Sequence, residues 1–184
     1  GKGVMKRLIL DRGFLDGKAI SLCKKQYGID ILIPIRRNMD LYVDAMALFQ
    51  ESDVHWVECK TSREEAKESI RLRPKAITQR EKKRQEKLRQ LKQQQPPPPP
   101  EEVLVKKEAA AIGEFRSWSS CTVPLTVVAN REHYADGHQE IWFLIDTKEV
   151  RDPSQTQQEY HLRTSTEERY RQLKCFSDLT HFTS

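Results

Sequence analysis

The sequence of 184 residues has no apolar run that approaches the roughly 20 residues needed to cross a bilayer. Its mean hydropathy of −0.74 agrees with that absence. The first residues also lack a basic segment followed by a long apolar stretch, which a secretory signal needs. We therefore expect a soluble protein that has no membrane partner.

Cysteine is sparse, and the four cysteines lie far apart in the sequence, at Cys23, Cys59, Cys121 and Cys175. The absence of a CxxC pair argues against a zinc site and fits the reduced thiols of an intracellular protein. We expect these residues to be structural and the protein to be cytoplasmic. The chain does not begin with Met and soon enters the apolar segment Leu8–Leu10, so we also expect it to be the back part of a longer protein.

Positive charge is concentrated in one region of a chain whose net charge is +5. The segment Arg71–Lys92 holds ten Lys or Arg residues against two Glu residues. After Pro74 it is rich in good helix formers, which predicts a long exposed helix that ends before the five prolines starting at Pro96. This tract is either an arm that contacts phosphates or a solvated low-complexity linker, and its composition alone favours the linker.

The residues before this tract have the pattern of a folded domain. Arg7–Leu10 and Asp30–Ile35 read as short buried strands, and Asp16–Tyr27 reads as a helix closed by Gly28. A strand, a helix and a second strand predict a parallel pair joined by a right-handed crossover. Leu41–Phe49 is a candidate second helix.

The residues after the tract read as a run of strands. The candidate strands are "EVLVKKE", "GEFRSWS", "TVPLTVVANRE" and "QEIWFLIDT". Asp136-Gly137 between the last two is a strong hairpin signal. His133 and His138 flank that turn, but no third metal ligand is evident, so ordinary hairpin histidines are favoured over a metal pair.

The last element, about Gln155 to Cys175, is predicted to be a helix with an unusual polar stripe. At about 100° per residue, four side chains fall within about 60° of one another. They are Tyr160, Arg163, Glu167 and Lys174. The simplest interpretation is a solvated face on which Arg163 and Glu167 form an ion pair worth roughly 0.3–0.5 kcal/mol. Alternatively, Thr164 or Ser165 caps a helix that starts later, which would remove Tyr160 from the stripe.

Asp11, in "LILDRGF", directly follows the first predicted strand. The ends of strands are the usual location of ligand chemistry in open α/β sheets. Taken alone, an aspartate there is more often a turn or cap residue than a metal ligand. Together with Glu167 it would supply two of the carboxylates that divalent cations require for phosphoryl transfer.

The segment "LILDRGF" and the spacing Y-x2-R-x3-E-x6-K resemble the DDE transposases of the YREK-motif group, whose catalytic domain is RNase H-like. The resemblance extends over most of the chain outside residues 63–100. It implies a mixed α/β chain with a partial RNase H-like core in residues 1–50. A β-rich insertion would occupy residues 51–150, including the charged helical and polyproline segment 63–100. The catalytic helix would lie in residues 151–184.

The resemblance also implies roles for individual residues. Asp11 and Glu167 would be the catalytic ligands of Mg²⁺ or Mn²⁺. The residues expected to contact duplex DNA are Tyr160, Arg163, Lys174 and Arg12. Arg, Lys and Tyr are suited to phosphate oxygens as a planar fork, a point charge and a neutral donor. The implied reaction is nicking at a transposon end, followed by attack of the freed 3′ hydroxyl on target DNA.

Two features depart from the family pattern. The family has a bulky apolar pair where this chain has Thr164, Ser165 and Thr166. The first catalytic aspartate would lie upstream of Gly1, so we expect this chain alone to be inactive. Its expected partners are DNA and either a second copy or an N-terminal transposase fragment, in a nucleoid-associated location. The alternatives are a non-catalytic DNA-binding remnant that regulates transposition and, more distantly, an unrelated metal nuclease.

Overall fold

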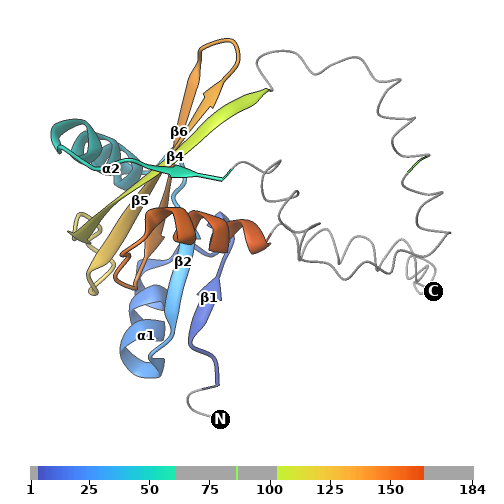
Figure 1. The fold of residues 1–184 in the computed structure, drawn as a ribbon. Helices are drawn as coiled ribbons and strands as arrows, with labels where there is room; N and C mark the ends of the chain where they lie inside the picture. The colour runs from blue at the N-terminus through green and yellow to red at the C-terminus, as the bar shows by residue number, and fades with distance from the viewer. Residues whose placement is uncertain (1–3, 61–85, 87–102, 164–184) are drawn as a thin grey trace, which may run out of the picture. The chain divides into compact units, whose positions relative to one another are not determined.

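The computed structural model describes residues 4–60, 86 and 103–163 (Figure 1). These residues form a mixed α/β chain, as expected, with a six-stranded sheet. In chain order the elements are β1 (Arg7–Ile9), the 3-10 turn η1 (Arg12–Phe14), α1 (Gly17–Tyr27), β2 (Asp30–Pro34), α2 (Asp40–Glu51), β3 (Val57–Cys59), β4 (Leu104–Phe115), β5 (Leu125–Tyr134) and β6 (Gln139–Asp146). A third α-helix covers residues 153–163. Apart from Glu86, the predicted charged helix and the prolines lie outside the described residues.

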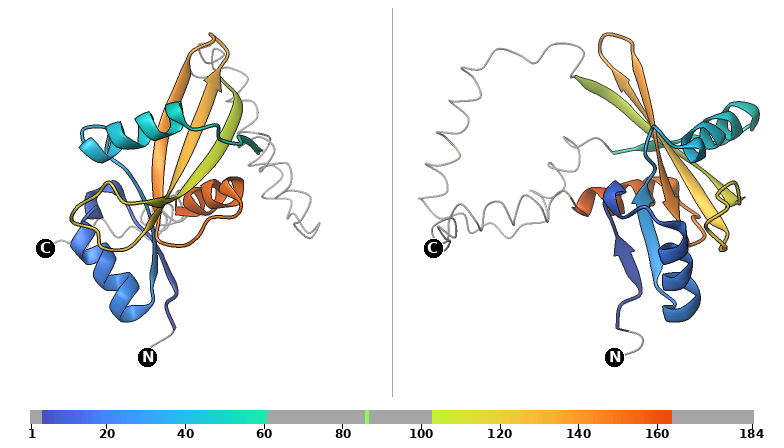
Figure 2. Two further views of the ribbon diagram at one scale, coloured as in Figure 1. Left: turned by 90° about the vertical axis from the view of Figure 1, so that its left-hand side faces the viewer. Right: turned by 180° about the vertical axis from the view of Figure 1, so that it is seen from behind.

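The sheet has the strand order β1-β2-β6-β5-β4-β3 (Figure 2). β1 pairs with β2 in parallel, with Leu8 opposite Ile31, which confirms the predicted parallel pair. β6 then pairs with β2 in the antiparallel direction, with Leu32 opposite Asp146. The sheet is therefore mixed, and β2 is the strand at which its direction changes.

Helix α1 connects the two parallel strands, and its ends are fixed by local residues. Asp16 is the N-cap, since its Oδ1 accepts from the backbone N–H groups of Lys18 at 2.9 Å and Ala19 at 3.3 Å. Gly28 ends the helix in the left-handed conformation, with φ of 66°, which glycine adopts without a Cβ clash. The sequence placed Asp16 inside the helix, whereas it caps the helix from outside.

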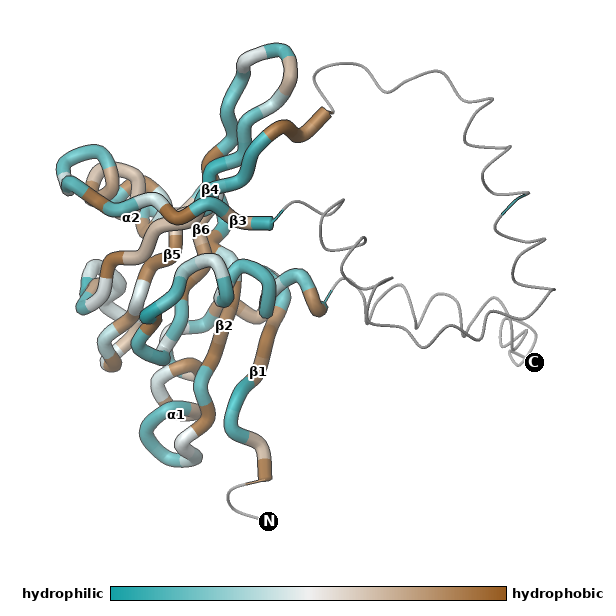
Figure 3. The backbone as a smooth tube through the Cα atoms, in the orientation of Figure 1, coloured by the Kyte–Doolittle hydropathy of each residue, from teal (hydrophilic) through white to brown (hydrophobic). Residues whose placement is uncertain are grey.

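Both faces of the sheet carry apolar residues, so the central strands are buried on two sides. Ile31 and Ile33 of β2 face a core that contains Leu41, Ala45 and other residues of α1 and α2. Leu32, between them, faces a second cluster to which Tyr160 of helix 153–163 belongs. The side chains of a strand alternate between its faces, which explains this division. Figure 3 shows the resulting apolar colour along β1 and β2.

The strands differ from the prediction in two places. The segments "EVLVKKE" and "GEFRSWS" were expected to be separate strands, but one 12-residue strand, β4, runs from the first segment into the start of the second and ends at Phe115. Between them lie Ala109 and Ala110, which are fully buried. Alanine has low strand propensity. Between packed layers, however, a small buried side chain is favoured over the larger side chains that usually form strands. The three-residue strand β3 was not predicted at all, because so short a segment carries no periodicity.

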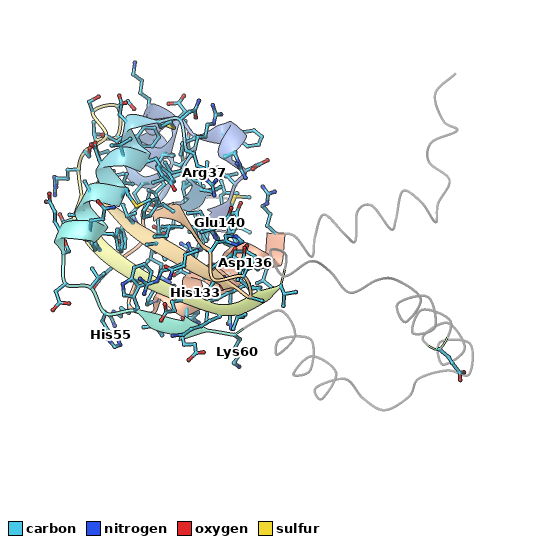
Figure 4. All side chains as sticks on the ribbon, turned by 90° about the horizontal axis from the view of Figure 1, so that it is seen from above. Arg37, His55, Lys60, His133, Asp136 and Glu140 are labelled. Carbon is cyan, nitrogen blue, oxygen red and sulfur yellow. The ribbon has the colours of Figure 1, made fainter. Side chains whose placement is uncertain are left out.

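The chain divides into two compact units, of which the first contains residues 1–59, 108–131 and 140–184. The second contains residues 60–107 and 132–139 and includes the predicted hairpin turn. Gly137 has φ of 91°, and Tyr134 N–H donates to His138 O at 3.1 Å. His138 Nδ1 lies 2.5 Å from Asp136 Oδ1, and its ring stacks on Tyr134. Figure 4 shows Asp136 and His133 in this unit.

Among the described helices, none is both long enough and apolar enough to cross a bilayer.

We predict that Gly17→Ala lowers the free energy of unfolding by roughly 1–3 kcal/mol, the usual range for an overpacked core site. A Cβ on Gly17 would lie 2.8 Å from the backbone carbon of Ser120 and 2.9 Å from the backbone nitrogen of Cys121. Gly113→Ala is the matched control, because a Cβ there meets nothing within 4 Å. Urea denaturation of both variants measures the difference, and equal midpoints would contradict the close packing of α1 on this loop.

Candidate functional site

Asp11 lies at the end of β1, where the chain turns away from the sheet. Its Oδ1 accepts from the backbone N–H of Arg12 at 2.7 Å and so caps the 3-10 turn η1. The side chain is nevertheless 51% exposed. Its second oxygen, Oδ2, accepts no hydrogen bond from the described residues. Asp11 is therefore both the cap residue that the cautious interpretation predicted and an accessible carboxylate at the end of a strand.

The turn after Asp11 is held in place by Arg36, which follows β2. Arg36 Nε donates to Arg12 O at 2.8 Å, and its Nη2 lies 3.3 Å from Gly13 O. Charge-assisted bonds to two successive carbonyl groups fix the path of the turn. The ends of the neighbouring strands β1 and β2 are thereby connected at the point where Asp11 leaves the sheet.

Helix 153–163 begins with a strong N-terminal signal. Asp152 is the N-cap, since its Oδ1 accepts from Ser154 N–H at 2.9 Å and from Ser154 Oγ at 2.7 Å. These bonds, the Ser154 hydroxyl first, lower the pKa of the Asp152 carboxyl. Pro153 occupies the first helical position, where its missing N–H costs nothing. The helix thus starts well before Thr164 and includes both Tyr160 and Arg163.

Arg7 of β1 connects this helix to the sheet. Its two terminal nitrogens donate to Asp146 at 3.0 and 2.7 Å, and its Nε donates to Glu159 at 2.6 Å. Asp146 is only 1% exposed, so the pair is largely removed from water. Burial alone would lower the pKa of Arg7, but the bonds and charges of Asp146 and Glu159 raise it, and the guanidinium stays charged.

A second ion pair, one helical turn later, joins the helix to the residue that caps the turn after β1. Arg163 Nη1 lies 3.2 Å from Asp11 Oδ1, and the Arg163 side chain is 23% exposed. Glu159 and Arg163 share one face of the helix because they are four residues apart. Their partners, Arg7 in β1 and Asp11 just after it, have the opposite order of charge along the chain. Glu159 pairs with Arg7 and Arg163 pairs with Asp11, so the two ion pairs follow the same order along both segments. Together they set the register of the helix against the strand.

Aromatic side chains support the end of the helix beside Arg163. The Tyr160 ring packs against Trp142 of β6, with 5.8 Å between ring centroids. The Arg163 guanidinium carbon lies 5.8 Å from the centroid of the Tyr160 ring, within the range of a cation–π contact. His161 meets Trp142 edge-on at 6.5 Å. Tyr160 is thus partly buried, and its ring supports the guanidinium of Arg163.

The structure brings together two residues of the predicted site, Asp11 and Arg163, which are far apart in the sequence. Arg12 is adjacent and exposed, and Tyr160 lies beside Arg163. Glu167 and Lys174 lie outside the described residues, so only Tyr160 and Arg163 of the predicted polar stripe are described.

Sequence reasoning missed three residues that position this site. They are Arg7, Arg36 and Glu159. Arg7 carried a usable signal, because a cation in a short buried strand requires a buried acidic partner. Asp146, at the end of the apolar segment "IWFLID", is such a buried acidic residue. Arg36 and Glu159 gave no signal, since arginine after a strand and glutamate on a helix are common on protein surfaces.

Asp11 fits the role of one ligand of a divalent cation, because it presents an accessible carboxylate of which one oxygen has no hydrogen bond from the described part of the chain. Within residues 4–60, 86 and 103–163, no three His, Cys, Asp or Glu side chains are grouped closely enough to hold a metal ion. Glu167, the other predicted ligand, lies outside those residues.

Comparison with known proteins adds no relative: no family model matches the sequence, and no curated protein or solved structure matches it.

We predict that Arg7→Met destabilises the chain by roughly 3–5 kcal/mol, because it leaves the buried Asp146 carboxylate without a cation. The double variant Arg7→Met with Asp146→Asn should recover much of the loss, since it also removes the unpaired charge. Arg116→Met is the control, because Arg116 and its partner Glu114 are both exposed. Chemical denaturation checks all three, and an Arg7→Met midpoint equal to that of the parent chain would exclude the proposed role of Arg7.

Proposed function

We propose that this chain is the catalytic part of a DDE transposase of the YREK-motif group, which moves DNA by metal-dependent phosphoryl transfer. The contact between Asp11 and Arg163 supports this most directly. The family motif requires one acidic residue after a core strand and an arginine on a late helix to share a site. In this chain those two residues are in contact, although no pattern of local sequence requires it.

The arrangement of elements supports the finer proposal of a partial RNase H-like core. β1, α1 and β2 form a parallel unit with an aspartate at the end of its first strand. β6 pairs with β2 before the chain enters helix 153–163, so β3 to β6 have the place of an insertion. The helix returns to β1 through Arg7 and Asp11, as a helix carrying the last acidic ligand should.

Each side chain of the site has a defined task under this proposal. Asp11 and Glu167 would hold Mg²⁺ or Mn²⁺, which supplies Lewis-acid stabilisation of the charge that develops at the phosphate. Arg163 and Arg12 would bind phosphate oxygens of the transposon end and align the scissile bond. Positioning and neutralisation of charge account for most of the catalysis in phosphoryl transfer.

Tyr160 and Lys174 complete the proposed DNA contacts, and the aromatic packing of Tyr160 on Trp142 would fix the position of its hydroxyl. The residues 1–184 supply counterparts for the second and third acidic ligands only. We therefore expect DNA binding from these residues, and cleavage only when another segment supplies the first aspartate. A DNA-binding remnant that regulates transposition is the alternative, and the cleavage experiment below separates the two.

We predict that the chain binds duplex DNA and that its affinity falls steeply with salt. The excess of Lys and Arg in Arg71–Lys92 and the cation at Arg163 supply the expected phosphate contacts. Arg163→Ala should weaken binding to transposon-end DNA more than Lys83→Ala, and should reduce the salt slope by about 1. Fluorescence anisotropy from low to high salt measures both. Absent binding at low salt, or binding unaffected by salt, would contradict the electrostatic contribution.

We predict that residues 1–184 do not nick transposon-end DNA with Mg²⁺ or Mn²⁺, and that adding a segment with the first acidic residue restores nicking. Asp11→Ala or Glu167→Ala should then abolish the restored activity, whereas Asp53→Ala, at an exposed position, should not. A gel assay of strand cleavage gives the result. Full activity from the 184 residues alone would show that Asp11 is not the second acidic ligand. A restored complex that binds ends without cutting them would favour the regulatory alternative.

A further inference from the structure

Phe14, the last residue of the turn η1, is an exposed aromatic side chain three residues after Asp11. Its exposed fraction is 68%, whereas the three other phenylalanines of the described residues are at most 9% exposed. Those three are Phe49, Phe115 and Phe143. A single exposed apolar side chain is common on protein surfaces, so exposure by itself indicates no partner. The surroundings of Phe14 supply the further observations.

The backbone that carries this ring is held on both sides. Phe14 N–H donates to Asp11 O at 2.9 Å and closes the turn. Arg36 donates to the carbonyl groups of the two residues between them. Leu10 before the turn and Leu15 after it pack against the core that contains residues of α1 and α2. A fixed backbone reduces the conformational entropy that binding would remove, which favours contact with a partner.

Positive charge and open space surround the turn. Arg12 is exposed, and Arg36 places a second guanidinium 2.8 Å from the Arg12 carbonyl oxygen. A Cβ added to Gly13 would meet nothing within 4 Å, so this part of the turn stands clear of the other described residues. Arg36 uses Nε and Nη2 on the turn, and its Nη1 donates to none of the residues that the structure describes. Both arginines can therefore bind a phosphate that reaches the turn.

The carboxylates of the same segment do not neutralise this charge. Asp11 is paired with Arg163, and Asp16 caps the N-terminus of α1. Three arginines thus stand against two carboxylates, and the turn keeps a net positive charge. An aromatic ring beside positive charge is the combination with which proteins bind single strands of nucleic acid.

A protein partner fits this turn less well than a nucleic acid does. A stable protein interface has a contiguous apolar centre from which charged residues are depleted. Besides Phe14, η1 holds only an arginine and a glycine, and the guanidinium of Arg36 adds a further charge. Phosphate groups, in contrast, gain from the same cations.

We propose that Phe14 stacks on an unpaired base of a DNA strand whose phosphates Arg12 and Arg36 bind. This inference rests on the proposed function, which supplies DNA as the partner, and it adds the state of that DNA at the turn. The bases of an intact duplex stack on one another, so a ring reaches a base face only where the strand is single or the duplex is opened. The strand that passes Asp11 is therefore unpaired there.

The first experiment measures, by fluorescence anisotropy in EDTA, the affinity of the full chain for a single-stranded oligonucleotide and for the matched duplex. Phe14→Ala should weaken binding to the single strand about fivefold or more, the usual effect of removing one stacking ring. It should change binding to the duplex by less than about twofold. Phe14→Leu, which is apolar but cannot stack, should show the same loss, whereas Phe14→Trp should retain the affinity.

Tyr27→Ala is the matched control, because Tyr27 is also exposed, at 53%, but lies at the far end of α1. It should bind both DNAs as the parent chain does. Parent affinity for the single strand in Phe14→Ala or Phe14→Leu would overturn the stacking. Binding of the parent chain to the duplex alone would overturn it too and leave the proposed function standing, whereas absence of binding to either DNA would contradict both.

The second experiment uses a duplex that is opened by a short mismatched segment carrying 5-iodouracil, a base that photocrosslinks to aromatic side chains stacked on it. The parent chain should bind this duplex more tightly than the matched one, and mass spectrometry should find the crosslink at Phe14. Phe14→Leu should lose the crosslink but keep the salt dependence of binding, because it removes no charge, whereas Arg12→Ala should lower the salt slope by about 1. A crosslink that persists in Phe14→Leu, or that forms only at other residues, would overturn the inference.

Discussion

The position of the candidate site depends on the contacts of the Arg7 guanidinium with Asp146 and Glu159. The Asp146 carboxylate is almost fully buried, where a charge without a partner would be costly. Arg7 supplies that cation from β1, two strands away across β2, and uses its remaining donor on Glu159 of helix 153–163. One buried charge thus fixes the relation of an edge strand, a central strand and a helix. The helix has little other choice of register, because a shift of one turn would separate Glu159 from Arg7.

The sequence predicted the regular elements where local rules apply. The capped helix α1, the parallel β1–β2 pair and the Asp136-Gly137 hairpin were each indicated by residues whose backbone preference is strong. β4 could not be predicted as one strand, because buried alanines give no strand signal until the layers around them are known. The order of the sheet was also beyond reach, since the pairing of β6 with β2 joins segments more than 100 residues apart.

For the candidate site, too, local sequence predicted some features, whereas contacts between distant segments could not be predicted. Asp11 could be recognised from its place after a strand, and its role as a cap was foreseen as well. Sequence spacing grouped Arg163 with Glu167, which lies outside the described residues, and gave no indication that Arg163 contacts Asp11. Spacing along a helix identifies which residues share a face, but only tertiary packing decides which strand that face meets. Arg7 and Arg36 act through that packing, so no motif contained them.

The connection between β3 and β4 has a consequence for how such a chain can vary. These strands are neighbours in the sheet, and in the sequence a long segment rich in polar residues and proline separates them. The entropy of closing such a loop grows only logarithmically, by about 0.6 kcal/mol for each doubling of its length. Insertions, deletions and low-complexity expansion at this point would therefore cost the sheet little and leave Asp11 and Arg163 where they are. The chain can gain or lose an appendage there by mutation while the six-stranded sheet is inherited unchanged.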